Sequence, residues 1–468
     1  MSHASEFAGK KIAVIGAAAT GLAAAPVLSR LGAAVRVYDS RPAAELGAAP
    51  EKLRDFAELR LGDPGYPGIE ECDLIVPSPG VPMDAEVLQA AVRRGTPVLS
   101  EIEVAYRLAR APIVAVTGTN GKTTTVMMSA EVLGAEGGAV QVAGNVLAGG
   151  FQVPLVRAAE EVPAEAWIVS EVSSFQLEWV AGFRPRIAVI TNITADHLNR
   201  HKTVERYVAA KARLLESQTA SDWTVLNLEN PATRDLMPAA RGRLLRFGRS
   251  THEWEGTWTE ERGGRRWIRG RLRDRVVDIA PVDALKVPGE HTVENALAAA
   301  AVGLAAGIAP EAIGRALGEF RGVADRMELV RQIDGVDYVN NTMCTNVDAA
   351  VRSIEAYSRP VVLIAGGRNK DLDLEPLGRC IAERVKSLVA IGTDGPHIAE
   401  SARRHGFDRI RTAGSMEEAV RAARDEAEAG DVVLLAPACA SFDWYSSFEE
   451  RGRDFRQQVN RLVENRPQ

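Results

Sequence analysis

Short apolar runs, each followed by a polar or glycine-rich loop, recur along the whole chain. The first run, 11–16, leads through an Ala/Leu-rich segment (22–31) to a second run, 35–39, which ends in Asp39. Apolar runs of this length separated by alanine-rich stretches predict βαβ units with buried parallel strands. Ligands of such sheets collect at the carboxyl ends of the strands, so the loops there are the first places to look for chemistry.

The same pattern continues to the end of the chain. Further strands are predicted at 73–77, 97–99, 113–116, 140–143, 167–170, 187–190, 223–226, 336–340, 360–365, 387–391 and 431–436. Helices are predicted at 84–95, 126–133, 204–216, 293–306 and 310–317. Residues 257–280 instead alternate polar and apolar side chains around Gly263-Gly264, which predicts β-hairpins.

The chain has 468 residues, too many for one hydrophobic core. We expect an α/β protein of three doubly wound domains that face a shared cleft. They are an N-terminal Rossmann-like domain (1–110), a central domain similar to P-loop ATPases (111–322) and a C-terminal Rossmann-like domain (323–468). Short boundaries near 110 and 322 predict rigid-body domain closure.

Composition narrows the function. Apolar residues make up 46 % and charged residues 25 % of the chain, with a net charge of -6. This balance gives no general attraction for nucleic acid or anionic membranes, so we expect neither as a partner. The four cysteines lie far apart without a CxxC pair, which predicts reduced thiols rather than disulfides or a zinc site. The first residues lack the apolar run of a signal peptide, and no stretch suits a bilayer span, so the expected location is cytoplasmic.

The strongest chemical signal is the stretch 112–125, PIVAVTGTNGKTTT. An apolar strand stops at a loop containing Gly118 and Gly121, and a helix follows. Glycines let backbone N–H groups face a phosphate, Lys122 can neutralise outer phosphates, and Thr123 can offer a hydroxyl to Mg²⁺. The usual Walker A spacing would place a glycine at Val116. The alternative is an ordinary strand-to-helix turn with a surface lysine.

Two later loops carry candidate metal ligands. Glu171 follows a predicted strand and can hold Mg²⁺ beside the phosphate loop, or it can simply be an acidic residue at a helix start capped by serine. His197 and His201 share helical spacing, but a zincin motif would need Glu where this chain has Leu198. Binding of Mg²⁺ by one histidine, or support of a metal-bound carboxylate, stays open. From the pattern alone, Lys211 is a solvated helix lysine.

The first domain offers a weaker nucleotide signal. The segment after the first strand imitates a dinucleotide fingerprint, but Ala18 stands at its second glycine position. A nucleotide bound near Asp39, Ser40 and Arg41 is at least as plausible as NAD. The loop 78–82 is either a ligand loop or a rigid turn.

Together these motifs resemble those of the ATP-dependent Mur ligases of peptidoglycan synthesis, over nearly the whole chain. The resemblance rests on 117–125, EVSSFQLE (171–178), NITADHLNRH (192–201), GEHTVENALAA (289–299) and PACASFDWYSSFEERGRDF (437–455). Within the family, the similarity is greatest to the members that add D-glutamate to UDP-N-acetylmuramoyl-L-alanine. It implies an acyl-phosphate intermediate made from ATP, and two Mg²⁺ ions. We also expect the protein to be a monomer.

The resemblance also implies residue roles. ATP would contact Gly118, Thr119, Asn120, Gly121, Lys122, Thr123, Thr124, Asn295, Arg326 and Asn341. The catalytic group would comprise Lys122, Glu171, His197 and Lys211. The two Mg²⁺ ions would be bound by Thr123 and Glu171, by His197, and by Lys211 if it is carbamylated. The UDP substrate would contact Thr20, Asp39, Ser40, Arg41, Ser78, Gly80, Asn145 and Ser173. The amino acid would contact Thr345, Lys370, Ser441 and Phe448.

Several positions depart from the family pattern. Thr292 stands where Asn is usual, Asp325 where His is usual, and Leu147 where Gly is usual. The usual Asp-Ser-Lys-Ala-Thr-Asn run reads Asn341-Thr342-Met343-Cys344-Thr345-Asn346. These changes leave two alternatives open. One is a related ligase for another amino acid, such as L-glutamate, including a folate-type polyglutamate ligase. The other is a non-catalytic nucleotide-binding scaffold.

Overall fold

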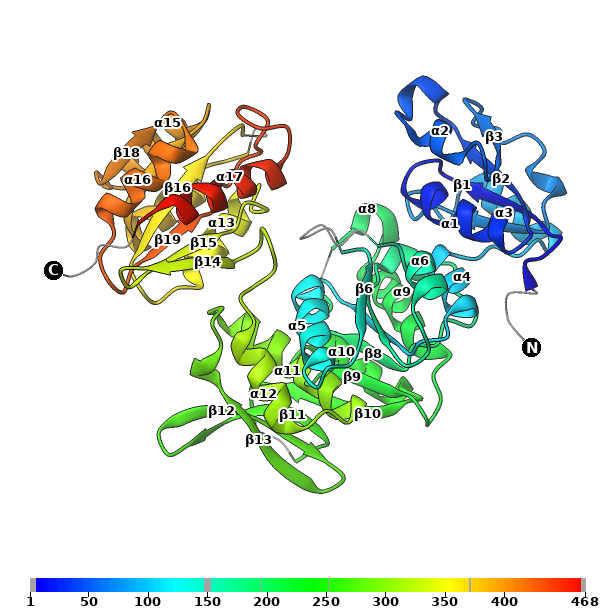
Figure 1. Cartoon of the computed structure of the whole chain (residues 1–468), viewed down its shortest axis with the longest axis horizontal. Coiled ribbons are helices and arrows are strands. Elements are labelled where there is room, and N and C mark those ends of the chain that lie inside the picture. The colour runs from blue at the N-terminus through cyan, green and yellow to red at the C-terminus, as the bar shows by residue number, and fades with distance from the viewer. Residues whose placement is uncertain (1–5, 147–152, 195, 252, 370–371, 464–468) are drawn as a thin grey trace. The chain divides into compact units, whose positions relative to one another are not determined.

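The computed structural model describes residues 6–146, 153–194, 196–251, 253–369 and 372–463. Its residues form two compact units. The first unit comprises Met1–Val282 with Glu294–Leu317, and the second comprises Asp283–Val293 with Gly318–Gln468. Figure 1 shows the chain coloured from its N-terminus to its C-terminus. The strands lie in three separate sheets, two in the first unit and one in the second.

The N-terminal sheet is parallel, with the strand order β3-β2-β1-β4. Its strands are β1 (Lys11–Ile15), β2 (Ala34–Asp39), β3 (Glu58–Leu61) and β4 (Leu74–Pro77). Its helices are α1 (Ala19–Arg30), α2 (Ala49–Leu53), α3 (Glu86–Arg94) and α4 (Glu101–Leu108). The parallel register brings the loops after Ile15, Asp39 and Pro77 to one edge. Predicted strand 97–99 is reduced to a single bridge between Ile75 and Val98.

The central sheet has the strand order β13-β12-β11-β10-β9-β8-β5-β7-β6. Its strands are β5 (Ile113–Thr117), β6 (Val140–Gly144), β7 (Trp167–Glu171), β8 (Ile187–Ile190), β9 (Trp223–Asn227), β10 (Arg243–Gly248), β11 (Gly256–Arg262), β12 (Arg265–Leu272) and β13 (Arg275–Pro281). Strands β5 to β11 run parallel to their neighbours in the first part of the sheet. Strands β11, β12 and β13 form the predicted antiparallel hairpins.

Helices follow most parallel strands of this sheet. They are α5 (Lys122–Gly134), α6 (Leu155–Glu161), α7 (Ser174–Leu177), α8 (Leu198–His201), α9 (Val204–Glu216), α10 (Pro231–Leu236), α11 (Glu290–Ala306) and α12 (Pro310–Glu319). Helix α5 begins at Lys122, four residues before the predicted start, so the lysine and the threonines form its first turn. A continuous core joins both sheets of the first unit, with Val14 and Leu28 in the same apolar cluster as Ile168 and Leu214.

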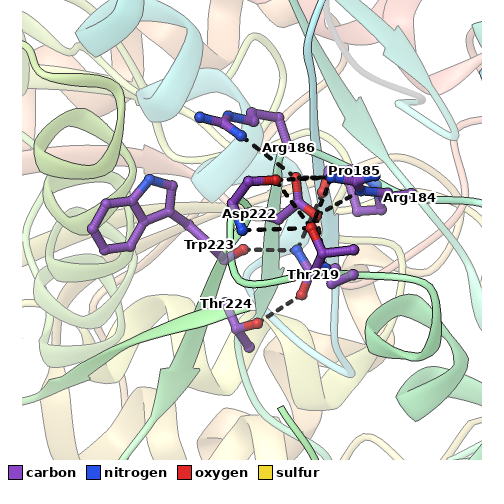
Figure 2. Close-up of polar contacts among 9 residues, drawn as sticks. Arg184, Pro185, Arg186, Thr219, Asp222, Trp223 and Thr224 are labelled. Atoms are coloured by element: carbon purple, nitrogen blue, oxygen red, sulfur yellow. Dashed lines mark hydrogen bonds and ion pairs between the residues drawn. The ribbon is translucent and has the colours of Figure 1, made fainter. Parts of the chain in front are cut away.

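A buried carboxylate fixes the edge of the central sheet opposite the phosphate loop (Figure 2). Asp222, directly before β9, accepts a hydrogen bond of 2.6 Å from Arg184 Nε and one of 2.8 Å from the backbone N–H of Thr219. Arg186, directly before β8, adds an ion pair of 3.6 Å. Burial alone would raise the pKa of Asp222, but the hydrogen bonds from Arg184 and Thr219 lower it on balance. The cluster therefore joins the N-terminal ends of the neighbouring strands β8 and β9.

The sheet of the second unit has the order β14-β15-β19-β16-β17-β18 and is parallel except for the edge strand β14. Its strands are β14 (Glu328–Ile333), β15 (Val336–Asn340), β16 (Val361–Gly366), β17 (Val385–Ile391), β18 (Ile410–Ala413) and β19 (Val432–Leu435). Its helices are α13 (Val347–Glu355), α14 (Glu375–Arg384), α15 (Gly395–Arg404), α16 (Met416–Glu426) and α17 (Phe448–Arg461). The boundaries near 110 and 322 stay predictions.

The four cysteines, Cys72, Cys344, Cys380 and Cys439, are free and buried. Burial raises the pKa of each thiol, to about 11 for Cys344 and Cys380 and to about 12 for Cys439. Such thiols stay protonated and packed in the core, which agrees with the prediction that they form no disulfide.

Candidate functional site

The phosphate loop lies between β5 and α5 with two glycines in left-handed conformations. Gly118 has φ +151° and Gly121 has φ +81°. A Cβ on Gly121 would lie 2.3 Å from Asn295 Oδ1, and a Cβ on Gly118 would lie 2.0 Å from Thr191 Oγ1. Both positions therefore require glycine for space as well as for backbone geometry. Asn295, on α11, also accepts a hydrogen bond of 3.3 Å from Thr125, which brings this predicted ATP ligand against the loop.

The predicted first magnesium ligands are in contact. Thr123 Oγ1 donates a 2.6 Å hydrogen bond to Glu171 Oε2. The pairing of β5 with β7 explains this, because Val116 lies opposite Glu171 and both strands end at the same edge. Lys122 Nζ donates to the carbonyl of Thr119 at 2.9 Å, so the ammonium group lies over the loop. A hydroxyl beside a carboxylate suits Mg²⁺, which takes few protein ligands and completes its shell with water and phosphate oxygens.

Lys211 contradicts the expectation of a solvated lysine. It is 1 % exposed, and its Nζ donates to Gly118 O at 2.8 Å and to Thr117 Oγ1 at 3.3 Å. Burial, together with the charge of Lys122, lowers the pKa of Lys211 to about 7. A neutral amine is the form that reacts with CO₂, so this side chain fits the carbamylation that the family resemblance implies. The signal was available: Tyr207, Lys211 and Leu214 share one face of α9.

The two histidines form part of an aromatic cluster rather than one helical face. His197 caps α8 with φ +51°, and its half-exposed ring lies 5.0 Å from the ring of Phe175. His201 is buried, and its Nε2 lies 3.0 Å from Ser174 Oγ. Burial and the neighbouring cations lower the pKa of His201 to about 4, so it is neutral. Of the two, His197 is the more exposed; its role as ligand of a second Mg²⁺ stays a prediction.

Sequence reasoning missed the asparagine that holds the phosphate loop. Asn192 Oδ1 accepts from the backbone N–H of Asn120 at 3.0 Å, and Asn192 Nδ2 donates to Asn120 O at 3.1 Å. Thr191 Oγ1 also donates to Asn120 O, at 2.7 Å. The loop after β8 therefore fixes the predicted ATP loop. The signal for it was the polar Thr-Asn pair directly after a buried strand.

The predicted UDP-substrate residues of the first sheet gather at one edge. Asp39 accepts from the backbone of Ala17 at 3.0 Å and from Arg41 Nη2 at 2.9 Å. The hydrogen bond from Arg41 lowers the pKa of Asp39 despite its burial. Ser78 packs on Gly16, whose added Cβ would lie 2.9 Å from Ser78 Cβ. Thr20 is buried in α1, whereas Ser40 and Gly80 are exposed.

Arg200 ties this edge to the central sheet. Its guanidinium pairs with Glu178 and donates to Val81 O at 2.8 Å. The other two predicted substrate residues lie beside Glu171: the N–H of Asn145 donates to Glu171 O at 2.9 Å, and Ser173 caps α7 through a capping box with Gln176. Ser173 therefore has the cap role that was the alternative reading of this segment, and this leaves its predicted ligand contact untested.

In the second unit, the predicted amino-acid residues lie on neighbouring loops at the carboxyl edge of the sheet. Thr345 follows β15, Ser441 follows β19 and is 2 % exposed, and Phe448 is the first residue of α17. The fourth predicted residue, Lys370, lies outside the described residues, as does Leu147.

Two of the departures from the family pattern, Asp325 and Asn341, make local hydrogen bonds. Asp325 Oδ1 lies 2.9 Å from Arg456 and accepts from Asn340 at 3.0 Å. Asn341, predicted to contact ATP, is 6 % exposed; its Oδ1 accepts from the N–H of Met327 and its Nδ2 donates to Ser353. Arg326 lies in the turn that these contacts hold.

The described residues contain neither a cluster of metal-binding side chains nor a helix able to span a membrane. Among the described residues, no group of three or more His, Cys, Asp and Glu side chains could hold a metal ion. No helix in the described ranges is long and apolar enough to cross a membrane.

The fold and this site define an α/β nucleotide-binding enzyme with a shortened phosphate loop and a buried lysine against it. Comparison with known families gives three matches in chain order: a MurD-like N-terminal domain (10–100), the Mur ligase middle domain (116–303) and the glutamate ligase domain of Mur ligases (325–439). The chain belongs to the Mur ligase family.

Curated relatives agree. The chain is 44 % identical to a UDP-N-acetylmuramoylalanine--D-glutamate ligase of Pelotomaculum thermopropionicum, over 97 % of this chain and 98 % of that one. It is 40 % identical to the protein of that name from Thermoanaerobacter sp. strain X514, over 98 % of this chain and 99 % of that one. Among solved structures, MurF of Acinetobacter baumannii is similar in fold, with a TM-score of 0.59, 17 % identity and coverage of 95 % and 93 %. The UDP-N-acetylmuramate-alanine ligase MurC of Thermotoga maritima is also similar in fold, with a TM-score of 0.57 and 20 % identity over 96 % of this chain and 99 % of that one.

Proposed function

We propose that this protein is an ATP-dependent ligase that adds D-glutamate to UDP-N-acetylmuramoyl-L-alanine in peptidoglycan precursor synthesis. One observation carries the reaction type: a buried lysine of lowered pKa lies against a phosphate loop whose Thr123 is paired with Glu171. The choice of D-glutamate is supported by the names of the full-length relatives. Mur ligases in general use ATP and magnesium.

The substrate carboxylate attacks the γ-phosphorus of ATP, and ADP leaves. The amine of glutamate then attacks the acyl-phosphate carbonyl, loses a proton and expels phosphate, which leaves an amide. Negative charge develops on phosphoryl oxygens first and on the carbonyl oxygen afterwards, so fixed cations and N–H groups supply most of the catalysis. Lys122 and the N–H groups of the loop hold the β- and γ-phosphates. Magnesium, when bound, neutralises charge between these phosphates.

The ligands of magnesium are part of the proposal. Thr123 and Glu171 would hold one ion, and His197 with a carbamylated Lys211 would hold the second. Carbamylation forms a bond between Lys211 Nζ and the carbon of CO₂ and releases one proton to water. The product has a carboxylate group that can bind magnesium, whereas the unmodified amine is not a ligand for this ion. The fit rests on the burial of Lys211 and on its contact with Gly118.

A substrate panel tests the proposal. Purified enzyme with ATP, Mg²⁺ and UDP-N-acetylmuramoyl-L-alanine should release phosphate and form product with D-glutamate, and not with L-glutamate or meso-diaminopimelate. Turnover with L-glutamate alone would replace the substrate assignment by another ligase of the family. ATP binding without turnover on any amino acid would favour the scaffold alternative. The monomeric state and the cytoplasmic location stay predictions; light scattering on the purified protein tests the first.

A further inference from the structure

The second unit contains a buried cation that the proposed reaction has not used. Arg451, on α17, is 1 % exposed. Its guanidinium donates to Thr342 Oγ1 at 3.0 Å, to Thr342 O at 3.0 Å and to Cys439 O at 3.1 Å. These acceptors are neutral, and among the residues that the structure describes no carboxylate forms an ion pair with the group. A buried guanidinium costs several kcal/mol in desolvation, so an arginine held by one hydroxyl and two backbone carbonyls needs a reason to be there.

The acceptors lie on the loops that carry the predicted amino-acid site. Thr342 follows β15 and precedes Thr345 by three residues; Cys439 follows β19 and precedes Ser441 by two. Thr342 Oγ1 also donates to the carbonyl of Phe448 at 2.9 Å. Arg451 therefore connects all three elements that contain Thr345, Ser441 and Phe448.

The loops themselves are strained or crowded where Arg451 holds them. Ala438 has φ +60°, a region that an alanine rarely adopts. The backbone of Arg368, after β16, pairs with Ala440 in both directions, at 2.8 and 3.0 Å. Arg451 Nη1 lies 3.1 Å from the position of a Cβ on Gly367. The loops after three strands, β15, β16 and β19, thus converge on one guanidinium, and loops in such conformations persist only when their surroundings fix them.

We propose that Arg451 is a positioning residue for the amino-acid substrate. It holds the loops after β15 and β19 and the start of α17 in binding geometry, and its positive charge favours a dicarboxylate at this edge of the sheet. The inference rests on the proposed function, because it assigns a role within the amino-acid site of that reaction. Asp443, whose charge acts on Arg451, accepts a hydrogen bond from the backbone N–H of Thr393 at 2.9 Å.

The experiment compares Arg451→Lys and Arg451→Met with Arg453→Met, which removes an exposed arginine of the same helix. Arg451→Met should raise the KM for D-glutamate about tenfold or more, because hydrogen bonds to a charged group and the charge itself are both lost. Arg451→Lys keeps the charge and should show a smaller rise. The KM values for ATP and for the UDP substrate should stay within about twofold, and Arg453→Met should match wild type.

A second pair guards against loss of folding. Thr342→Val removes the hydroxyl that bridges Arg451 and Phe448 at nearly constant volume, and Thr342→Ser retains it. We expect a raised KM for D-glutamate in Thr342→Val only, with a thermal midpoint close to that of Thr342→Ser. Equal changes in all three KM values, or lower kcat and stability with an unchanged KM for D-glutamate, would overturn the inference. Absence of D-glutamate turnover in wild type would instead refute the proposed function.

Discussion

The burial of Lys211 leads to a quantitative prediction about its chemistry. With a pKa of about 7, roughly 75 % of the amine is neutral at pH 7.5, against ~0.1 % for an ordinary lysine. The form that reacts with CO₂ is therefore enriched several hundred-fold at this position. At fixed dissolved CO₂, lowering the pH from 8 to 6 should reduce the neutral fraction from ~90 % to ~10 % and the carbamate at least as strongly.

Carbon-13 NMR of enzyme equilibrated with ¹³C-bicarbonate measures this directly, without metal or substrate. One carbamate resonance should be present in wild type, absent in Lys211→Met and retained in Lys286→Met, where an exposed lysine is removed. Lys211→Ala should also lose ligase activity, and added bicarbonate should fail to restore it. A carbamate signal that survives Lys211→Met, or a normal rate in Lys211→Ala, would refute the reasoning.

Three further predictions concern the phosphate loop and the frame of the sheet. Glu171→Gln should lower kcat, measured by phosphate release, about 100-fold or more and leave the thermal midpoint unchanged, because it weakens the magnesium site proposed at Thr123 and Glu171. Gly121→Ala should weaken ATP binding in calorimetry, since its Cβ would lie 2.3 Å from Asn295 Oδ1 at φ +81°; unchanged affinity would contradict this. Asp222→Asn should cost about 1–3 kcal/mol of unfolding free energy at pH 7. Because the folded-state pKa of Asp222 is lowered, its contribution to the free energy of unfolding is present above pH 3.8 and is lost as the pH falls below that value. Chemical denaturation should therefore find that the difference in unfolding free energy between wild type and Asp222→Asn becomes smaller at low pH.

The strand pattern predicted the phosphate loop and placed Glu171 at a strand end beside it, and the family resemblance then paired Glu171 with Thr123. It could not predict from charge that Lys211 is buried, although the residue lies on the apolar face of its helix. Arg451 was missed for the same reason: it shares a helix face with Phe455 and Val459. In both cases the buried nitrogen atoms donate to backbone carbonyls that lie far away in the sequence, and no local pattern reveals such contacts.

Strand prediction failed mainly at sheet margins and where charged residues interrupt the pattern. The edge strands β3 (ELRL) and β14 (ELVRQI) and the interior strand β10 (RLLRFG) contain charged residues and were not predicted. An edge strand needs apolar side chains on one face at most, so its pattern resembles that of a loop. The fully buried strands, by contrast, were found within one or two residues of their ends.

The buried thiols make the wild-type protein a ready background for site-specific labelling. Because the four native cysteines are enclosed and protonated, maleimide dyes should react only with cysteines introduced at exposed positions, one in each unit. A donor and an acceptor dye at two such positions would report the distance between the units in solution. Adding nucleotide and substrate one at a time would then show which of them moves the units, without first removing any native side chain.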